Sequence, residues 1–111
     1  MKRQFKTGAN RDTNEDKLEV ARFLSPEVIE RFCEYMHKNR KLKDGSLRDP
    51  DNWKKLFGEN HEQVCLDSLM RHTLSYWKNC YTTKDDKQKE EELCGIMFNA
   101  MASLYALLKK K

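Results

Sequence analysis

Three residues near the C-terminus stand in a line that suits a ligand or metal site. Glu91, Gly95 and Asn99 fall at i, i+4 and i+8, so one face of a helix would carry all three. A glycine inside a helix costs about 1 kcal/mol against alanine, which suggests that a neighbour needs the room. Asn99 stands among apolar residues, where its amide must find partners. The same pattern also fits a satisfied hydrogen bond between two helices, with Glu91 an ordinary surface residue.

A second polar group lies about twenty residues earlier. Asp67, Ser68, Arg71 and His72 stand beside an apolar stripe. A lone histidine in such a place is more often a core residue with one hydrogen bond than a ligand, so both interpretations stay open. The sequence has no Ser/His/Asp arrangement that indicates a nucleophile, no glycine-rich phosphate loop and no H-E-x-x-H motif.

The net charge of +4 is concentrated at the two ends of the chain. Without Lys2, Arg3 and the three final lysines, basic and acidic residues nearly balance. A concentrated basic face is typical of domains that bind nucleic acid, so nucleic acid is not the expected partner. One local excess of Lys and Arg remains between Lys38 and Lys55. It indicates either a solvated loop or a loop that contacts phosphate.

The sequence favours a reducing, aqueous compartment. It has no apolar run of about 18 residues that would span a bilayer and no signal-peptide pattern. The four cysteines form no C-x-x-C pair, and we expect free thiols. His61 and Cys65 stand four apart, but no second close pair completes a tetrahedral zinc set.

These residues must be positioned by helices, and the predicted fold is all-α: a small bundle of three long helices plus a short one, with an extended N-terminal arm. The arm covers 1–24 and the single bundle domain covers 25–111. The first long helix, near 26–40, begins at the capping pair Ser25-Pro26. A short helix is framed by Asp49 as cap, Pro50 as first residue and Gly58 past its end.

The two remaining long helices are expected near 61–79 and 88–108. The predicted core stripe of the earlier one consists of Leu66, Leu69, Met70, Thr73 and Trp77. The last helix is apolar around most of its circumference from Leu93 to Leu108, which indicates burial on more than one side. Because a core of this size gives little net stability, we expect a homo-oligomer that associates through this last helix.

Taken in order, several short motifs resemble the phage and prophage dATP/dGTP diphosphohydrolase family, small all-α proteins related to the MazG-type NTP pyrophosphohydrolases. The resemblance covers about residues 5–105, and the ordered set is more specific than any single piece. The matching motifs are F-K-T-G-A-N-R-D-T (5–13), Lys17, L-S-P-E-V-I-E-R-F (24–32), Y-M-H-K-N-R (35–40), D-N-W (51–53), S-L-M-R-H (68–72) and E-E-L-C-G-I-M-F-N-A (91–100).

The resemblance implies hydrolysis of a purine deoxynucleoside triphosphate to the monophosphate and pyrophosphate, with Mg²⁺ or Mn²⁺ as the cofactor. It also implies a cytoplasmic protein of a bacterial host cell. The implied site residues are Glu91, His72 and Asn99 for catalysis, Glu91, Asp67 and Asn99 for the metal, and Arg11, Lys17, Asn52, Trp53, Lys54 and Arg71 for the substrate.

One motif of the MazG relatives is not intact, because Cys94 stands three residues after Glu91 where those relatives carry Asp. A catalytically inactive relative is therefore one alternative. It would bind nucleotides or a host protein, for instance as a phage inhibitor of defence. A small nucleic-acid binder that uses the basic chain ends is the other alternative.

Overall fold

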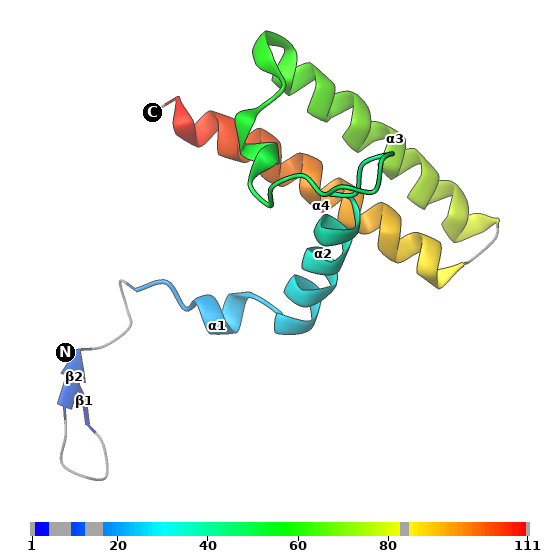
Figure 1. Ribbon diagram of the computed structural model, residues 1–111. Coiled ribbons are helices and arrows are strands. Elements are labelled where there is room, and N and C mark those ends of the chain that lie inside the picture. The colour runs from blue at the N-terminus through cyan, green and yellow to red at the C-terminus, as the bar shows by residue number, and fades with distance from the viewer. Residues whose placement is uncertain (1, 5–9, 13–16, 83–84, 111) are drawn as a thin grey trace.

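The protein is all-α, as predicted, and its computed structural model describes residues 2–4, 10–12, 17–82 and 85–110 (Figure 1). The three long helices are α2 (Pro26–Lys38), α3 (His61–Tyr81) and α4 (Asp86–Lys109), each within two residues of its predicted bounds. The short helix α1 (Val20–Phe23) precedes them. Among the described helices, none has the length and apolarity needed to cross a membrane.

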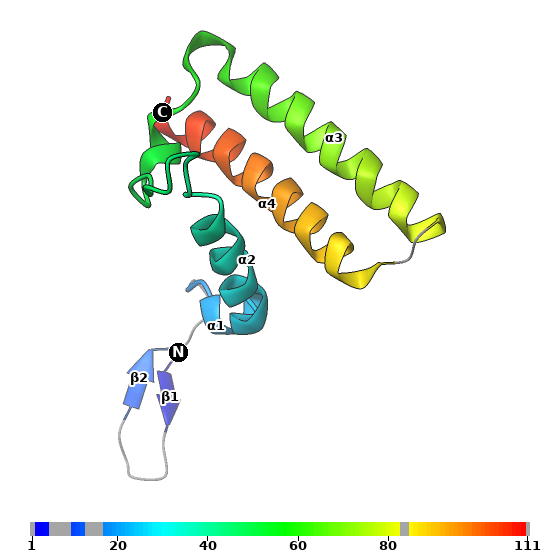
Figure 2. The same ribbon diagram turned by 45° about the vertical axis from the view of Figure 1, so that its right-hand side comes forward.

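The N-terminal arm carries a small element that the sequence does not predict. Strands β1 (Lys2–Gln4) and β2 (Asn10–Asp12) pair antiparallel, with Arg3 opposite Arg11. Two strands of three mostly polar residues have no hydrophobic alternation, the pattern by which a strand is found in a sequence. The strands lie apart from the helices (Figures 1 and 2).

Side chains cap the N-termini of α2 and α4. The hydroxyl of Ser25 accepts a hydrogen bond from the Val28 amide at 3.3 Å, and proline occupies the first turn of α2, as predicted. Asp85 caps α4 by accepting from the amides of Lys87 and Gln88. Asn79, near the end of α3, exchanges two hydrogen bonds with the backbone of Asp85. This exchange ties the end of α3 to the start of α4.

Helix α4 is the element on which the others assemble. It runs beside α3 as an antiparallel hairpin, and α2 and the 3₁₀ helix η1 (Asn52–Lys55) also pack on it (Figure 2). The hydrophobic residues that are buried within the described ranges are Phe32, Cys65, Cys94 and Ala102. These side chains are few and mostly small, so the α3–α4 contact is close but buries little apolar surface.

Buried polar groups supplement this small core. The Phe57 amide donates to His61 Nδ1 at 3.1 Å, so Nδ1 is the unprotonated ring nitrogen. Nε2 of His61 then donates to the Ala102 carbonyl on α4 at 3.0 Å. His61 thus ties the loop before α3 to the middle of α4 and is a structural residue. All four cysteines are free, as predicted.

The prediction of a short helix that begins at Pro50 is wrong in both the bounds and the type of helix. In place of a helix that begins at Pro50 there are two 3₁₀ turns, η1 and η2 (Gly58–Asn60), and Asp49 caps neither of them. Leu56 interrupts the segment with a φ of 67°, a left-handed backbone that ends a helix. The contacts that Trp53 makes with α4 outweigh the local helix signals here.

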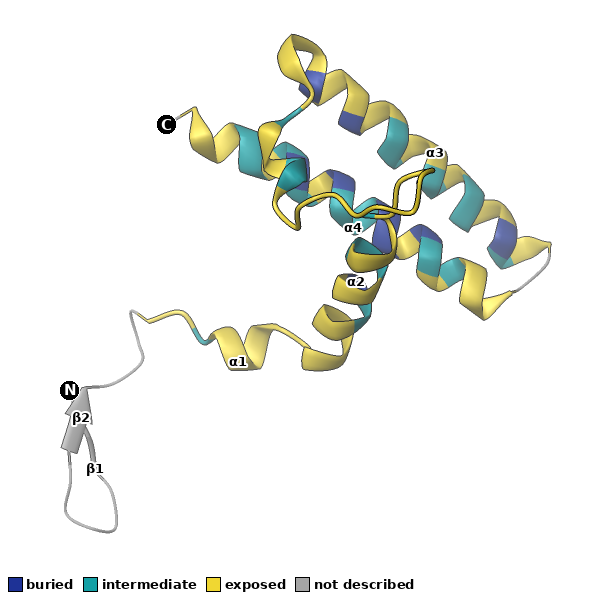
Figure 3. Ribbon diagram, in the orientation of Figure 1, coloured by how far each residue is buried: buried dark blue, intermediate teal, exposed yellow. Residues whose placement is uncertain are grey.

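The predicted core stripe of α3 is correct at Leu69 and Thr73, which are half-buried, and wrong at its other three positions. Leu66, Met70 and Trp77 are 49%, 55% and 62% exposed, whereas His61, Cys65 and Asn79 are the buried positions of this helix. Figure 3 shows buried and half-buried positions of α3 on the side that faces α4. At Gly95 the space between the two helices is filled by the His72 ring from α3, so a larger residue at position 95 would not fit without a shift.

Candidate functional site

A cavity of about 580 Å³ lies where the end of α2, the following loop, η1, α3 and α4 meet. Its volume is in the range of small-molecule sites, which is about 300–1,000 Å³. Four of the predicted site residues line it together, from three different elements: Asn52, Trp53, His72 and Asn99. The fold therefore brings part of the predicted site into one place.

Trp53 forms an aromatic wall of this cavity. Its ring meets Phe98 edge-on at 6.2 Å and Tyr105 at 5.1 Å between centroids, which fixes η1 against α4. Tyr35 and Phe98 also line the cavity. Lys54 Nζ lies 5.8 Å from the Trp53 ring centroid as a cation–π contact, and Lys54 itself does not line the cavity.

Gly95 makes room for His72. A Cβ built at Gly95 would lie 2.7 Å from three atoms of the His72 ring, so no larger residue fits without a shift. The ring is held from α4, since Nδ1 lies 3.5 Å from Oε1 of Glu92, whose carboxylate accepts a hydrogen bond from Gln88. A glycine inside a helix lowers stability, and the structure explains why one stands here: the missing side chain leaves space for a histidine that lines the cavity.

Asn99 links α3 to α4 and has a fixed orientation. Its Nδ2 donates to Ser68 Oγ at 3.1 Å and to the Gly95 carbonyl at 2.8 Å. A carbonyl only accepts, so the second bond identifies the nitrogen. Asn99 is 3% exposed and lines the cavity. Its amide oxygen has no protein donor among the described residues, and it can accept a hydrogen bond from a ligand.

Two arginines that the sequence prediction did not single out also line the cavity. Arg40 and Arg48 face each other across the neck of the loop after α2, since the Arg48 amide donates to the Arg40 carbonyl at 2.9 Å. Nε of Arg40 donates to the Arg48 carbonyl at 2.6 Å. The turn at Asp44-Gly45 closes this loop, with Gly45 at a φ of 88°. Their signals in the sequence are the basic excess of this segment and, for Arg40, the Y-M-H-K-N-R motif.

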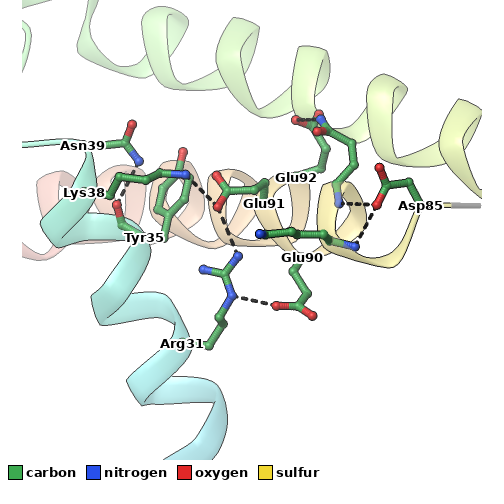
Figure 4. Close-up of polar contacts among 10 residues, drawn as sticks. Arg31, Tyr35, Lys38, Asn39, Asp85, Glu90, Glu91 and Glu92 are labelled. Atoms are coloured by element: carbon green, nitrogen blue, oxygen red, sulfur yellow. Dashed lines mark hydrogen bonds and ion pairs between the residues drawn. The ribbon is translucent and has the colours of Figure 1, made fainter.

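Glu91 is held by two cations rather than exposed to a ligand (Figure 4). Its carboxylate lies 2.8 Å from Lys38 Nζ and 3.1 Å from a guanidinium nitrogen of Arg31. The hydrogen bond from Lys38 has the largest effect on the pKa of Glu91 and lowers it; burial opposes this, and the hydrogen bond from Arg31 lowers it further, so the net pKa lies below the ordinary value. Glu90 also binds Arg31, and the two carboxylates raise the pKa of that guanidinium.

The three predicted metal ligands are not gathered into one set. Asp67 is exposed on α3, where it accepts a hydrogen bond from Gln63, and Glu91 and Asn99 are two turns apart on α4. Within the described ranges, no group of three His, Cys, Asp or Glu side chains is placed to hold a metal ion. The described residues alone therefore form no preformed cage, and the metal role of these residues stays a prediction.

Two of the other predicted substrate contacts, Arg71 and Lys17, do not line this cavity. Arg71 lines a separate cavity of about 360 Å³ near the end of α3. Lys17 is exposed ahead of α1. Arg11 belongs to β2, and its side chain lies outside the described part of the structure. Their roles also stay predictions.

The close approach at Gly95 leads to the first prediction. Gly95→Ala should destabilise the protein by about 1–3 kcal/mol, because the added methyl group forces the His72 ring to move. In a His72→Ala background the same change should instead stabilise by up to about 1 kcal/mol, because alanine is then only the better helix former. Urea unfolding of the four proteins of this double-mutant cycle measures both values. A stabilising Gly95→Ala in the wild-type background would contradict the contact.

The ion pairs of Glu91 lead to a pH prediction. Because the folded pKa of Glu91 is lowered, its contribution to stability is present above its ordinary pKa of 4.5 and is lost as pH falls through the lowered value. Glu91→Gln should therefore destabilise at neutral pH by up to about 1 kcal/mol and make little difference near pH 2. Urea unfolding across this range measures the difference. Glu27→Gln, at an exposed position in the first turn of α2, is the matched control.

Comparison with known proteins gives one match. Residues 7–111 match the family described as dATP/dGTP diphosphohydrolase, N-terminal. This match covers nearly the whole chain, including every cavity-lining residue named above. No curated protein and no solved structure matches the chain.

Proposed function

Because this chain belongs to the dATP/dGTP diphosphohydrolase family, we propose that it hydrolyses purine deoxynucleoside triphosphates to the monophosphate and pyrophosphate. We place this activity in the cytoplasm of a bacterial host cell, with Mg²⁺ or Mn²⁺ as the cofactor. The observation that carries the proposal is the cavity in which an aromatic wall, a free amide oxygen and two arginines come together.

The aromatic part of the cavity suits a purine base. Trp53, Tyr35 and Phe98 supply apolar faces or edges of the kind against which flat rings pack. The amide oxygen of Asn99 offers an acceptor to an exocyclic amino group, and the side chain of Asn52 adds a further donor and acceptor. Adenine and guanine both carry such an amino group, in agreement with the purines in the family description.

The cationic part suits a triphosphate. Guanidinium groups bind phosphate oxygens in pairs, and Arg40 and Arg48 are held opposite each other by the loop backbone. Lys38, at the end of α2, is 62% exposed and binds Glu91. A triphosphate carries more negative charge than one carboxylate, so it would compete for Lys38 and release Glu91 from one of its two partners.

A divalent ion would complete this arrangement only together with the substrate. Mg²⁺ commonly binds one or two carboxylates and takes its other ligands from phosphates and water, so Glu91 need not be part of a protein cage. When bound, such an ion neutralises phosphate charge and activates water. Glu91 is the carboxylate that we assign to it, and Asp67 remains a more distant candidate.

His72 is the residue that we assign to proton transfer. Its Nδ1 lies 3.5 Å from Oε1 of Glu92, which orients the ring. Nε2 is then the ring nitrogen that we assign to proton transfer. The ring lines the cavity next to Asn99. A neutral imidazole so oriented would take the proton from the attacking water.

A second function is favoured by a specific observation. Glu91, the assigned metal ligand, is already neutralised by Lys38 and Arg31. An inactive relative that binds a purine nucleotide, or presents its surface to a host protein, would keep the cavity and need no metal. Binding without turnover distinguishes this function from hydrolysis.

The test is a pyrophosphate-release assay with the four dNTPs and with ATP and GTP, in Mg²⁺, Mn²⁺ or EDTA. We expect turnover of dATP and dGTP with a divalent ion and none with EDTA. Glu91→Gln should lower kcat by about two orders of magnitude or more, because one electrostatic contact of the transition state is lost. Trp53→Ala should mainly raise KM, because it removes a wall of the base pocket.

Glu90→Gln is the matched control for Glu91→Gln. Glu90 also binds Arg31 but not Lys38, and its side chain is 55% exposed. The control removes the same charge one residue away and should leave kcat within a fewfold of wild type. Full activity of Glu91→Gln would place the metal elsewhere. Stoichiometric dATP binding by isothermal titration calorimetry, without turnover in either metal, would establish the second function instead.

A further inference from the structure

Helix α3 carries a continuous apolar stripe that its own chain does not cover. The stripe consists of Leu66, Met70, Leu74, Trp77 and Tyr81. Their spacing of four, four, three and four residues keeps them on one side of a helix, as in the seam of a coiled coil. All five are exposed, from 49% at Leu66 to 78% at Tyr81.

The position of α3 explains this exposure. Of the described helices and strands, only α4 and η2 pack on α3, which leaves it at an edge of the molecule (Figures 1 and 3). At about 100° per residue, the stripe lies roughly opposite Cys65, His72 and the other positions that face α4. Turning α3 to bury the stripe would remove Ser68 and His72 from the cavity, so α4 cannot cover it.

We propose that a second copy of this chain covers the stripe, by antiparallel pairing of α3 with α3 about a two-fold axis beside Leu74. Isologous contacts of this kind are the commonest way in which identical chains associate. A stable interface buries about 800 Å² per partner, and one buried aromatic side chain supplies about 150–250 Å². Trp77 and Tyr81, with the three aliphatic side chains and the stems of their flanking residues, bring the stripe into this range.

The order of residues along the stripe favours the antiparallel direction. Antiparallel pairing sets Leu66 against Tyr81 and Met70 against Trp77 of the second copy, so a smaller side chain meets an aromatic ring at each step. Asp67 and Lys78 lie on the same edge of the stripe, and the pairing brings Asp67 close to Lys78 of the second copy. Parallel pairing would place the two Lys78 side chains on opposite edges of the seam and would not bring Asp67 close to Lys78.

The outer side of α4 is the competing surface, and it is less continuous. Leu93, Leu104, Leu107 and Leu108 are exposed, between 41% and 56%. Between Leu93 and Leu104, the same side carries half-buried Met97 and the small Ala100. The sequence predicts that the last helix forms the contact between copies of the chain. The exposed aromatic residues of the stripe, Trp77 and Tyr81, favour α3 instead.

The test measures the mass of the full chain by light scattering during gel filtration, at about 50 µM and without nucleotide. Wild type should be a dimer. Leu74→Arg should be monomeric, because it places two buried charges at the axis, and Leu104→Arg on α4 should remain a dimer. A monomeric wild type would overturn the proposal, and a dimer broken by Leu104→Arg but not by Leu74→Arg would assign the seam to α4.

A charge-reversal pair tests the direction of pairing without an apolar substitution. Asp67→Lys and Lys78→Asp should each weaken the dimer about threefold to fivefold in sedimentation equilibrium, at low salt where exposed charges interact most. The double variant should recover the wild-type dissociation constant. Failure of the double variant to recover, with both single variants weakened, would overturn the antiparallel register. Circular dichroism of each variant confirms that the helices are retained.

Discussion

The contact between Gly95 of α4 and the His72 ring of α3 is the constraint on which most of this structure depends. The His72 ring occupies the space of a missing side chain, and no Cβ fits there. Cys65 and Ala102, both small, are fully buried further along the hairpin. Each of these positions fits its neighbours in size, because side chains between packed helices must fill the space without overlap.

This constraint sorts the residues of α3 by size and polarity. His61, Ser68 and His72 face α4, where each has a partner on that helix or in the cavity. The large apolar residues occupy the outer side of the same helix. One helix thus provides a wall of the candidate site on one side and an uncovered apolar surface on the other. A change in the contacts on the outer side of α3 would therefore change the positions of His72 and Ser68 in the candidate site.

The sequence predicts the helices well because their signals are local. Ser25-Pro26 and the long apolar patterns define α2, α3 and α4 to within two residues. It also identifies Gly95 and Asn99 as residues that packing must explain, and both have such an explanation. The sequence does not predict the features that depend on contacts between residues far apart in the chain. The side of α3 that faces inward depends on Gly95, the 3₁₀ turns depend on Trp53 meeting α4, and the pairing of Arg40 with Arg48 depends on a loop closing.

The position of α4 in the chain sets the order in which the protein can fold. Helices α3 and α4 are neighbours in sequence, and the exchange between Asn79 and Asp85 closes the short connection between them. Closing a short loop costs little chain entropy, so this hairpin is the natural nucleus. Helix α2 and η1 pack on α4, which follows them in the chain. During translation these earlier segments cannot make their contacts with α4 until α4 has left the ribosome.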